Sequence, residues 1–179
     1  VETLDLLIIE LSSFQLELLN KAKIDVGVIL NISDDHMDRY DSFAQYFQVK
    51  AKLFDLAEIN IINRDDEKLE ALKHKANLSF GVSESHSKDD YILTDSNQPP
   101  FIERGDGFAI ELKSLKLIGE HNKLNVMAAI ACMQSALPKF NQFKIDNLKG
   151  VNHRLEWLKN VQGIEFYNDS KATNVNATI

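Results

Sequence analysis

The chain has 179 residues, of which 44% are hydrophobic and 26% charged, and this composition is typical of a soluble globular protein. Its formal net charge is −7, and without clusters of lysine and arginine this acidic balance argues against a nucleic-acid or anionic-membrane partner. The longest apolar runs, such as residues 6–9, are too short to cross a bilayer, and no export signal opens the chain. The single cysteine, Cys132, lies among apolar residues and indicates a buried thiol in a reducing cytoplasm.

Short apolar runs rich in β-branched residues predict strands at residues 3–10, 25–31, 60–63 and 164–168. Helical patterns lie between them, at residues 14–22, 42–57, 66–75 and 121–137. Strands that are apolar on both faces are typical of parallel sheets covered by helices. The alternation therefore predicts an α/β fold with a doubly wound, mostly parallel sheet.

Residues 78–117 show a different pattern, in which short alternating segments are separated by polar loops. This pattern predicts a small antiparallel addition to the main sheet. A helix over residues 143–149 is expected to end at Gly150, and we therefore divide the chain into residues 1–150 and 151–179. Because Val1 is not a translation start and the last residues form a polar run with functional character, we expect a piece of a longer protein.

Polar residues follow three of the predicted strands, at Glu10, at residues 33–36 and at residues 169–171. Ligands of open α/β sheets bind beyond the carboxyl ends of the strands. We therefore expect these residues to gather at one edge of the sheet, where the chemistry would take place.

The acidic residues at this edge each have two interpretations. Glu10 would need a partner or a metal ion at the end of a buried strand, but it equally suits the start of a helix beside Ser12. Residues 34–38 combine three aspartates with His36, which could form a hard-cation site or a solvated acidic loop that caps a helix. Their spacing alone does not decide between these interpretations.

Lys50 lies on an apolar stripe of its predicted helix, in line with Phe43, Phe47 and Phe54, whereas Lys52 projects to the opposite side. Its stem could pack on that stripe while the amine reaches water. Alternatively, the lysine is buried with a lowered pKa. Its neutral amine could then react with carbon dioxide to form a carbamate, which is a carboxylate-like ligand.

Two further motifs could bind anions. Asn122 and Asn125 fall in the first turn of a helix, where they could contact a nucleotide, although Asn122 could simply cap the helix. Arg154 could clamp a phosphate or form a surface pair with Glu156.

Taken in order, these motifs resemble those of the muramyl (Mur) ligases. The most specific are Glu10-Leu-Ser-Ser-Phe-Gln-Leu-Glu17 and Asn168-Asp-Ser-Lys-Ala-Thr-Asn174, which are similar to the branch that adds D-glutamate. Between them lie Asp35-His-Met-Asp-Arg-Tyr40, Tyr46 with Lys50 four residues on, Gly119-x-His-Asn-x-x-Asn125 and His153-Arg154. The resemblance covers residues 7–174.

The resemblance implies an ATP-dependent ligase of peptidoglycan precursor synthesis in the bacterial cytoplasm. ATP would phosphorylate the alanyl carboxylate of UDP-N-acetylmuramoyl-L-alanine, and the amine of D-glutamate would attack the acyl phosphate. The fold would be a central ATP-binding domain like that of P-loop NTPases, followed by the start of a Rossmann-like domain. The resemblance also implies two magnesium ions and a monomer. In the family a phosphate-binding loop lies upstream of Glu10, and because this sequence lacks one, we expect the chain alone to be inactive.

Metal and substrate roles carry over by position in the motifs. Glu10 resembles the ligand of a magnesium ion that bridges the ATP phosphates. His36 and the carbamate of Lys50 resemble ligands of the second magnesium ion. The residues expected to support that second ion from behind are Asp35 and Tyr46, and those expected to line the muramoyl substrate are Ser12 and Gln15.

The other assignments concern the nucleotide and the amino acid. The resemblance implies ATP contacts for Asn122, Asn125, Arg154 and Asp169. Lys171 and Thr173 would lie near D-glutamate and the reacting phosphate, with Lys171 counted among the catalytic residues beside Glu10, His36 and Lys50.

Two other functions fit parts of the pattern. A ligase resembling folylpolyglutamate synthase would share the fold, but the motif at residues 168–174 favours the branch that adds D-glutamate. A non-catalytic α/β binding module would suit a complete chain that lacks the phosphate-binding loop. The sequence immediately upstream would decide between an enzyme and such a module.

Overall fold

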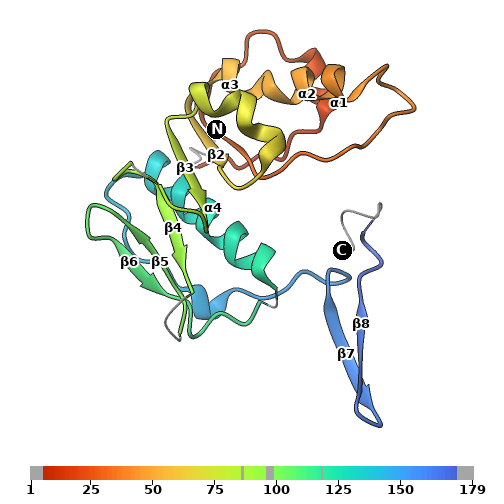
Figure 1. The fold of residues 1–179 in the computed structure, drawn as a ribbon, viewed down its shortest axis with the longest axis vertical. Coiled ribbons are helices and arrows are strands. Elements are labelled where there is room, and N and C mark those ends of the chain that lie inside the picture. Colours follow the sequence, from red (N-terminus) through yellow and green to blue (C-terminus); the bar gives the residue numbers. More distant parts are fainter. Residues whose placement is uncertain (1–5, 86, 96–98, 118, 173–179) are drawn as a thin grey trace, which may run out of the picture.

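The computed structural model describes residues 6–85, 87–95, 99–117 and 119–172. Its larger part is a sheet with the strand order β1-β2-β3-β4-β5-β6, and a separate two-stranded sheet consists of β7 and β8 (Figure 1). The strands are β1 (Ile24–Ile29), β2 (Ala57–Asn63), β3 (Leu78–Gly81), β4 (Tyr91–Thr94), β5 (Phe101–Arg104), β6 (Ala109–Glu111), β7 (Glu156–Val161) and β8 (Ile164–Asn168).

The larger sheet is mixed. Parallel pairing joins β1 to β2, β2 to β3 and β3 to β4, whereas β4, β5 and β6 pair in antiparallel fashion. The predicted α/β sheet with a small antiparallel addition is therefore confirmed. At one edge of the sheet lies β1, with β2 as its neighbour.

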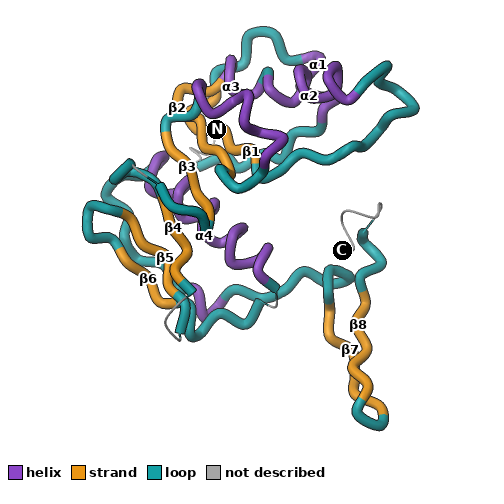
Figure 2. The backbone as a smooth tube through the Cα atoms, in the orientation of Figure 1, coloured by secondary structure: helices purple, strands orange, loops and turns teal. Residues whose placement is uncertain are grey.

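Local signals explain where the first helices begin. Ser12 caps the first helix, since its hydroxyl accepts a hydrogen bond from Gln15 N–H at 3.3 Å while Gln15 Oε1 accepts one from Ser12 N–H at 2.8 Å. The hydroxyl of Ser42 accepts from Gln45 N–H in the same way at the second helix. The helices are α1 (Ser13–Leu18), α2 (Phe43–Ala51), α3 (Leu53–Leu56), α4 (Glu120–Ala136) and the 3-10 segments η1 (Glu67–Lys75) and η2 (Ile145–Asn147), as Figure 2 shows.

Both faces of the larger sheet are covered, and two consecutive residues of β2 show how. Ile61 belongs to a core that includes α4, whereas Ile62 belongs to a second core that includes residues of α2, α3 and η1. Neighbouring strand residues point to opposite faces, so each isoleucine enters a different layer. Ile61 is 0% exposed and Ile62 is 1% exposed, and the sheet is therefore doubly wound.

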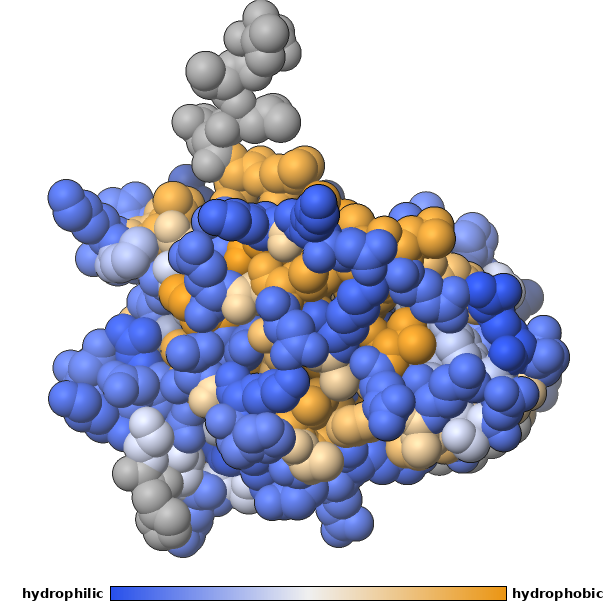
Figure 3. Space-filling view, turned by 90° about the horizontal axis from the view of Figure 1, so that it is seen from above, coloured by the Kyte–Doolittle hydropathy of each residue, from blue (hydrophilic) through white to orange (hydrophobic). Residues whose placement is uncertain are grey.

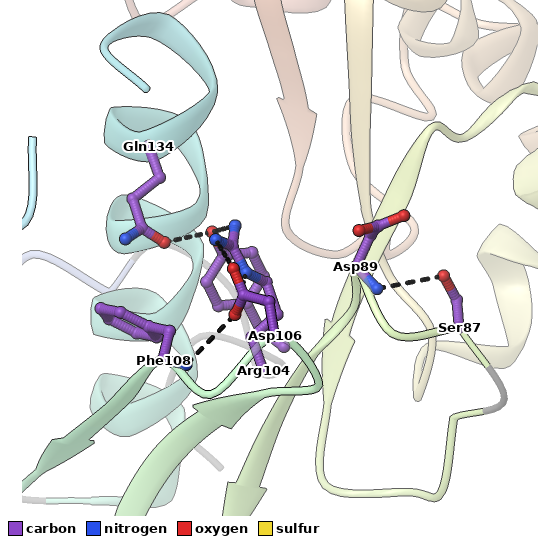
Figure 4. A network of polar contacts seen from close by, with 7 residues as sticks. Ser87, Asp89, Arg104, Asp106, Phe108 and Gln134 are labelled. Atoms are coloured by element: carbon purple, nitrogen blue, oxygen red, sulfur yellow. Dashed lines mark hydrogen bonds and ion pairs between the residues drawn. The ribbon is translucent and has the colours of Figure 1, made fainter. Parts of the chain in front are cut away.

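Arg104 links the antiparallel strands to α4. Its Nη1 donates to the Tyr91 hydroxyl at 2.7 Å, and that hydroxyl donates to Gln134 Oε1 at 2.5 Å (Figure 4). Two further nitrogens of the guanidinium bind the Asp106 carboxylate at 3.1 and 2.6 Å. The guanidinium carbon also lies 5.1 Å from the centroid of the Tyr91 ring and 5.9 Å from that of Phe108. Arg104 thus has a carboxylate, a hydroxyl and two aromatic rings as partners.

Three predicted elements differ in the structure. Residues 6–10 of the predicted first strand join no sheet, and Leu7, Ile8 and Ile9 are 67%, 83% and 61% exposed. That prediction was wrong for these residues, because an apolar run becomes a strand only where a neighbouring strand pairs with it. The helix predicted over residues 42–57 is interrupted at Lys52, and Ala57 already belongs to β2. The segment over residues 66–75 is a 3-10 helix rather than an α-helix.

Further differences concern strand direction. β3 and β4 lie in the region predicted to be antiparallel, yet they pair in parallel with each other. β5 and β7 were not predicted, because their sequences mix polar and apolar residues. The helix predicted over residues 143–149 is only a short 3-10 turn, η2.

The last predicted strand, over residues 164–168, is β8, but it pairs with β7 in an antiparallel hairpin instead of joining the larger sheet. Gln162 and Gly163 connect the two strands, with φ angles of 52° and 85°. Positive φ at both positions is typical of the two-residue turns that suit the twist of a hairpin. Figure 1 shows the hairpin extending away from the larger sheet.

The face shown in Figure 3 is mainly hydrophilic, with hydrophobic side chains exposed in places. Within the described residues, no helix combines the length and the apolar character that a membrane crossing needs. Cys132 of α4 is half-buried, and this burial raises the pKa of its thiol to about 11. The thiol is therefore protonated at neutral pH.

Candidate active site

Three segments that are far apart in the sequence enclose a pocket of about 320 Å³. One is the approach to α1 with its first turn, the second follows β1, and the third is α2. The lining residues are Glu10, Leu11, Ser12, Ser13, Gln15, Asp35, His36, Tyr46 and Lys50. The structure thus brings together the residues for which sequence analysis expected metal and muramoyl contacts.

The first turn of α1 supplies hydroxyl and amide groups to the pocket. Ser12 and Gln15 are held by their mutual capping bonds, and Ser12 Oγ also lies 3.0 Å from Gln15 Oε1. Ser13 is 3% exposed, and its hydroxyl has no hydrogen-bond partner within the described part of the chain. A buried hydroxyl without a partner is unfavourable, so Ser13 suits a polar group that enters the pocket. Sequence analysis missed this residue.

Lys50 is a half-buried cation in the wall of the pocket. Burial lowers the pKa of its amine, while the negative charges of Glu10 and Asp35 oppose that shift. Within the described residues, no hydrogen bond or ion pair engages its amine. A lysine in these surroundings contains more neutral amine at a given pH than an exposed lysine does.

Tyr46 stands beside Lys50, one turn earlier on α2. Burial raises the pKa of its phenol, and the nearby charge of Asp35 acts in the same direction. Its ring lies 5.3 Å from the ring of Tyr40 and 6.4 Å from that of Phe43, measured between centroids. The contact with Tyr40 packs α2 against the loop that carries Asp35 and His36, whereas Phe43 belongs to α2 itself.

The donor set of the pocket suits magnesium better than a metal that needs many protein ligands. Within the described residues, no three His, Cys, Asp or Glu side chains lie close enough to hold one ion together. Magnesium commonly takes one or two protein ligands and completes its shell with phosphate oxygens and water. The carboxylate of Glu10 is a ligand of this type, whereas the ammonium group of Lys50 carries a positive charge that would repel a cation.

The other residues selected from sequence lie elsewhere. Asn122 and Asn125 are in the first turn of α4, outside the lining of the pocket. The edge expected to unite Asp169 and Lys171 with Glu10 is not formed, because residues 169–171 follow β8 in a different sheet. Thr173 lies outside the described residues.

Pairing of β7 with β8 brings residues 153–155 close to residues 168–171. Leu155 N–H donates to Asp169 Oδ1 at 3.1 Å, and Lys171 N–H donates to the carbonyl of His153 at 3.0 Å. Glu156 accepts a hydrogen bond from His153 N–H at 2.9 Å, so its partner is His153 rather than Arg154. The hairpin therefore brings the backbone around Arg154 close to Asp169 and Lys171, whereas Asn122 and Asn125 lie in α4.

A second pocket, of about 350 Å³, has polar groups that satisfy one another. Arg64 donates to the backbone carbonyls of Gly81 and Tyr91 at 2.9 Å each. Asp90 accepts from Ser79 N–H at 2.5 Å and from the hydroxyl of Ser85. This network joins β3 to β4 and has a structural role.

Comparison with known proteins shows which family this chain resembles. The family model of the Mur ligase middle domain matches residues 1–133. The UDP-N-acetylmuramoylalanine–D-glutamate ligases of Aliivibrio salmonicida and Methylobacillus flagellatus are 38% and 35% identical over 98% and 99% of this chain. The chain spans 40% of the length of each of these relatives. The fold is also that of the MurF ligase of Thermotoga maritima solved with ADP, with a TM-score of 0.63 and 22% identity over 83% of this chain and 36% of that one.

Proposed function

Because the chain belongs to the Mur ligase family, we propose that it is the catalytic centre of an ATP-dependent ligase that joins D-glutamate to UDP-N-acetylmuramoyl-L-alanine. One observation carries this proposal: Glu10, Asp35, His36 and Lys50 line one pocket beside the hydroxyl and amide groups of α1. Relatives that match nearly the whole chain are named for this reaction, which supports the choice of substrates.

The proposed reaction has two steps. A carboxylate oxygen of the alanyl group attacks the γ-phosphorus of ATP, and the bond to the β-phosphate oxygen breaks to leave ADP and an acyl phosphate. The amine of D-glutamate then attacks the acyl carbon. The tetrahedral intermediate loses a proton and expels phosphate, which leaves the amide. Negative charge accumulates on phosphate oxygens in both steps and must be offset by the site.

Glu10, His36 and a modified Lys50 are the residues that would hold magnesium in this pocket. The chemistry that bound magnesium supplies is the neutralisation of charge on the phosphate groups. Glu10 would bind one ion, and His36 with the carbamate of Lys50 would bind the other. Asp35 donates no proton in this scheme. Its carboxylate accepts a hydrogen bond from the backbone N–H of His36 at 2.9 Å and so holds the loop that carries both residues.

Carbamylation of Lys50 would replace a positive charge, which repels a cation, with a negative charge, which can bind one. The neutral amine nitrogen forms a bond to the carbon of carbon dioxide and loses a proton, so a group of charge +1 becomes one of charge −1. The lowered pKa of Lys50 favours the neutral amine that this reaction needs. A carbamate would then match a divalent cation, whereas an ammonium group would repel it.

The remaining roles follow the motifs. Asn122, Asn125, Arg154 and Asp169 would contact ATP, and Lys171 with Thr173 would contact D-glutamate. Residues 1–150 would form the ATP-binding domain, and residues 151–179 would begin a Rossmann-like domain. We propose a monomer of the bacterial cytoplasm.

The test is formation of ADP by the full-length protein. Sustained ADP release, over many turnovers, is expected only when ATP, magnesium, UDP-N-acetylmuramoyl-L-alanine and D-glutamate are all present. L-glutamate is the matched control for the configuration of the amino acid. Equal turnover with L-glutamate, or ligation of D-glutamate to an unrelated acceptor only, would overturn the proposal.

A further inference from the structure

The backbone of His36 has a conformation that its surroundings must hold. Its φ angle is 55°, in the left-handed region that residues other than glycine rarely adopt. Its N–H donates to Asp35 Oδ1 at 2.9 Å, and its carbonyl accepts from Arg39 N–H at 2.9 Å and from Tyr40 N–H at 3.2 Å. These bonds hold the backbone of the turn, whereas the direction of the imidazole depends on the neighbours of the ring.

Within the described residues, the His36 ring contacts Phe14 and lies near the carboxylate of Asp35. The centroids of the Phe14 and His36 rings are 4.9 Å apart, and the planes are inclined by 51°. Asp35 Oδ2 lies 3.7 Å from His36 Nε2. A shift of Phe14 would therefore leave one side of the imidazole without support.

Arg39 holds Phe14 through two contacts with α1. Its guanidinium carbon lies 4.9 Å from the centroid of the Phe14 ring, and its Nη2 donates to Glu17 Oε2 at 2.6 Å. Phe14 and Glu17 are three residues apart, which places their side chains on the same face of the helix. The ring attracts the cation, and the carboxylate fixes its position.

These three residues act beside the pocket rather than in it. Phe14, Glu17 and Arg39 are absent from the pocket lining that the described residues form, although His36 belongs to it. The side chain of Arg39 is 52% exposed, and exposed ion pairs contribute little to stability. What the contact does is fix α1 against residues 35–40, and both of these segments form walls of the pocket.

We propose that Arg39 is a positioning residue of this site. By holding Phe14 against the imidazole, it directs His36 toward the divalent cation that His36 would bind. This inference rests on the proposed function and deepens it, since it explains how a strained residue on a loop keeps one orientation. Arg39 itself touches neither the substrate nor the cation.

The test uses the full-length protein with ¹⁵N-labelled histidine, and follows the imidazole signals during titration with magnesium. The signal of His36 is assigned with His36→Ala. Arg39→Ala is expected to shift the His36 signal and to raise the magnesium concentration at half-response about tenfold, as loss of a supporting contact does in metal sites. Phe14→Leu should produce the same two changes, and Arg39→Lys should give an intermediate response because it keeps the charge.

The matched control is Lys68→Ala, since Lys68 places its ammonium 5.1 Å from the Phe43 ring and does not contact His36. It should leave the His36 signal unchanged. A normal His36 signal and a normal magnesium response in Arg39→Ala would overturn the positioning role. If magnesium left the His36 signal unchanged in the unmodified protein, and His36→Ala kept full turnover, the proposed function of the site would fail instead.

Discussion

Two half-buried cations in this chain have opposite surroundings. Arg104, between the antiparallel strands and α4, binds a carboxylate and a tyrosine hydroxyl and lies over an aromatic ring. Lys50, in the pocket, has no hydrogen bond or ion pair within the described residues. The hydrogen bond to Asp106 raises the pKa of Arg104, whereas burial lowers the pKa of Lys50.

This difference between Arg104 and Lys50 suggests that one cation contributes to stability and the other to function. A buried charge with all its partners is compatible with a stable fold, because its lost hydration is replaced. A buried charge without hydrogen-bond or ion-pair partners lowers the stability of the fold. Such charges are typical of functional sites. We therefore expect substitutions of Arg104 to affect unfolding, and substitutions of Lys50 to affect turnover.

The largest expected effect is that of Lys50→Ala on turnover. We expect the full-length enzyme to lose about 10²–10³-fold in kcat, as when one group that stabilises transition-state charge is removed. The temperature of unfolding should change little, because the cost of burying the ammonium group and its attraction to Glu10 and Asp35 oppose each other. Steady-state kinetics and calorimetry on the same preparation measure both quantities.

Acetate and Lys50→Arg sharpen this experiment. Acetate should restore part of the turnover of Lys50→Ala by occupying the place of the carbamate, whereas Lys50→Arg should stay inactive because its charge is permanent. Lys139→Ala, at an exposed position, is the control and should have normal turnover. Full activity of Lys50→Arg would rule out a carbamate at this position.

Arg104→Ala tests the opposite member of the comparison. Loss of the bonds to Asp106 and to the Tyr91 hydroxyl should lower the free energy of unfolding by about 2–3 kcal/mol. Turnover per folded molecule should remain normal. Urea unfolding followed by circular dichroism measures the loss, with the exposed Lys113→Ala as control. A loss of turnover without a loss of stability would break the comparison.

A third cation, Lys171, is exposed. It tests whether a lysine that is not buried can contribute to substrate binding. We expect Lys171→Ala to raise KM for D-glutamate or lower kcat, with about a tenfold loss in kcat/KM from one missing charge contact. ATP binding should change little. Titration with ATP and kinetics with D-glutamate measure the two effects separately. Equal losses of ATP affinity and of D-glutamate use would instead assign Lys171 to the nucleotide site. Lys149→Ala serves as the exposed control.

The smallest effect concerns the pH dependence of stability at Asp106. Its hydrogen bond from Arg104 lowers the pKa of the carboxyl from 3.8 to about 2. Because the pKa is lower in the folded state, the stabilisation is present above pH 3.8 and is lost as the pH falls toward 2. The difference in stability between the natural protein and Asp106→Asn should be below about 1 kcal/mol at pH 6, since the pair is partly exposed. It should shrink between pH 4 and 2, and a difference that grew there would contradict this sign.

Sequence patterns predicted the strands β1 and β2, whereas the half-buried β5 and the exposed β7 were missed. Residues 26–29 and 61–62 are apolar or glycine because both faces of β1 and β2 are covered, so composition reports their environment directly. Residues 164–168 are similarly apolar, yet β8 is exposed in a hairpin. An apolar composition shows that a segment is suited to burial. It does not show which strand the segment pairs with.

The pocket shows the same division. The resemblance of the motifs in order selected Glu10, His36 and Lys50, which the structure brings to one pocket, although residues 6–10 of the strand predicted to end at Glu10 join no sheet. Their chemical roles remain proposals. Ser13 was missed because a sequence does not distinguish its hydroxyl from that of Ser12. The contact of Arg39 with Phe14 depends on the packing of two segments and leaves no periodic signal.

The two neighbouring isoleucines of β2 have a consequence for cooperativity. Because Ile61 serves the core beneath α4 and Ile62 the core beneath the pocket, one strand cannot separate from its neighbours without exposing both layers. We infer that the two cores melt in a single transition. Occupation of the pocket by the muramoyl substrate would then slow hydrogen exchange in α4, on the far side of the sheet. Thermal stability would thus be shared between the two layers, although their chemical roles differ.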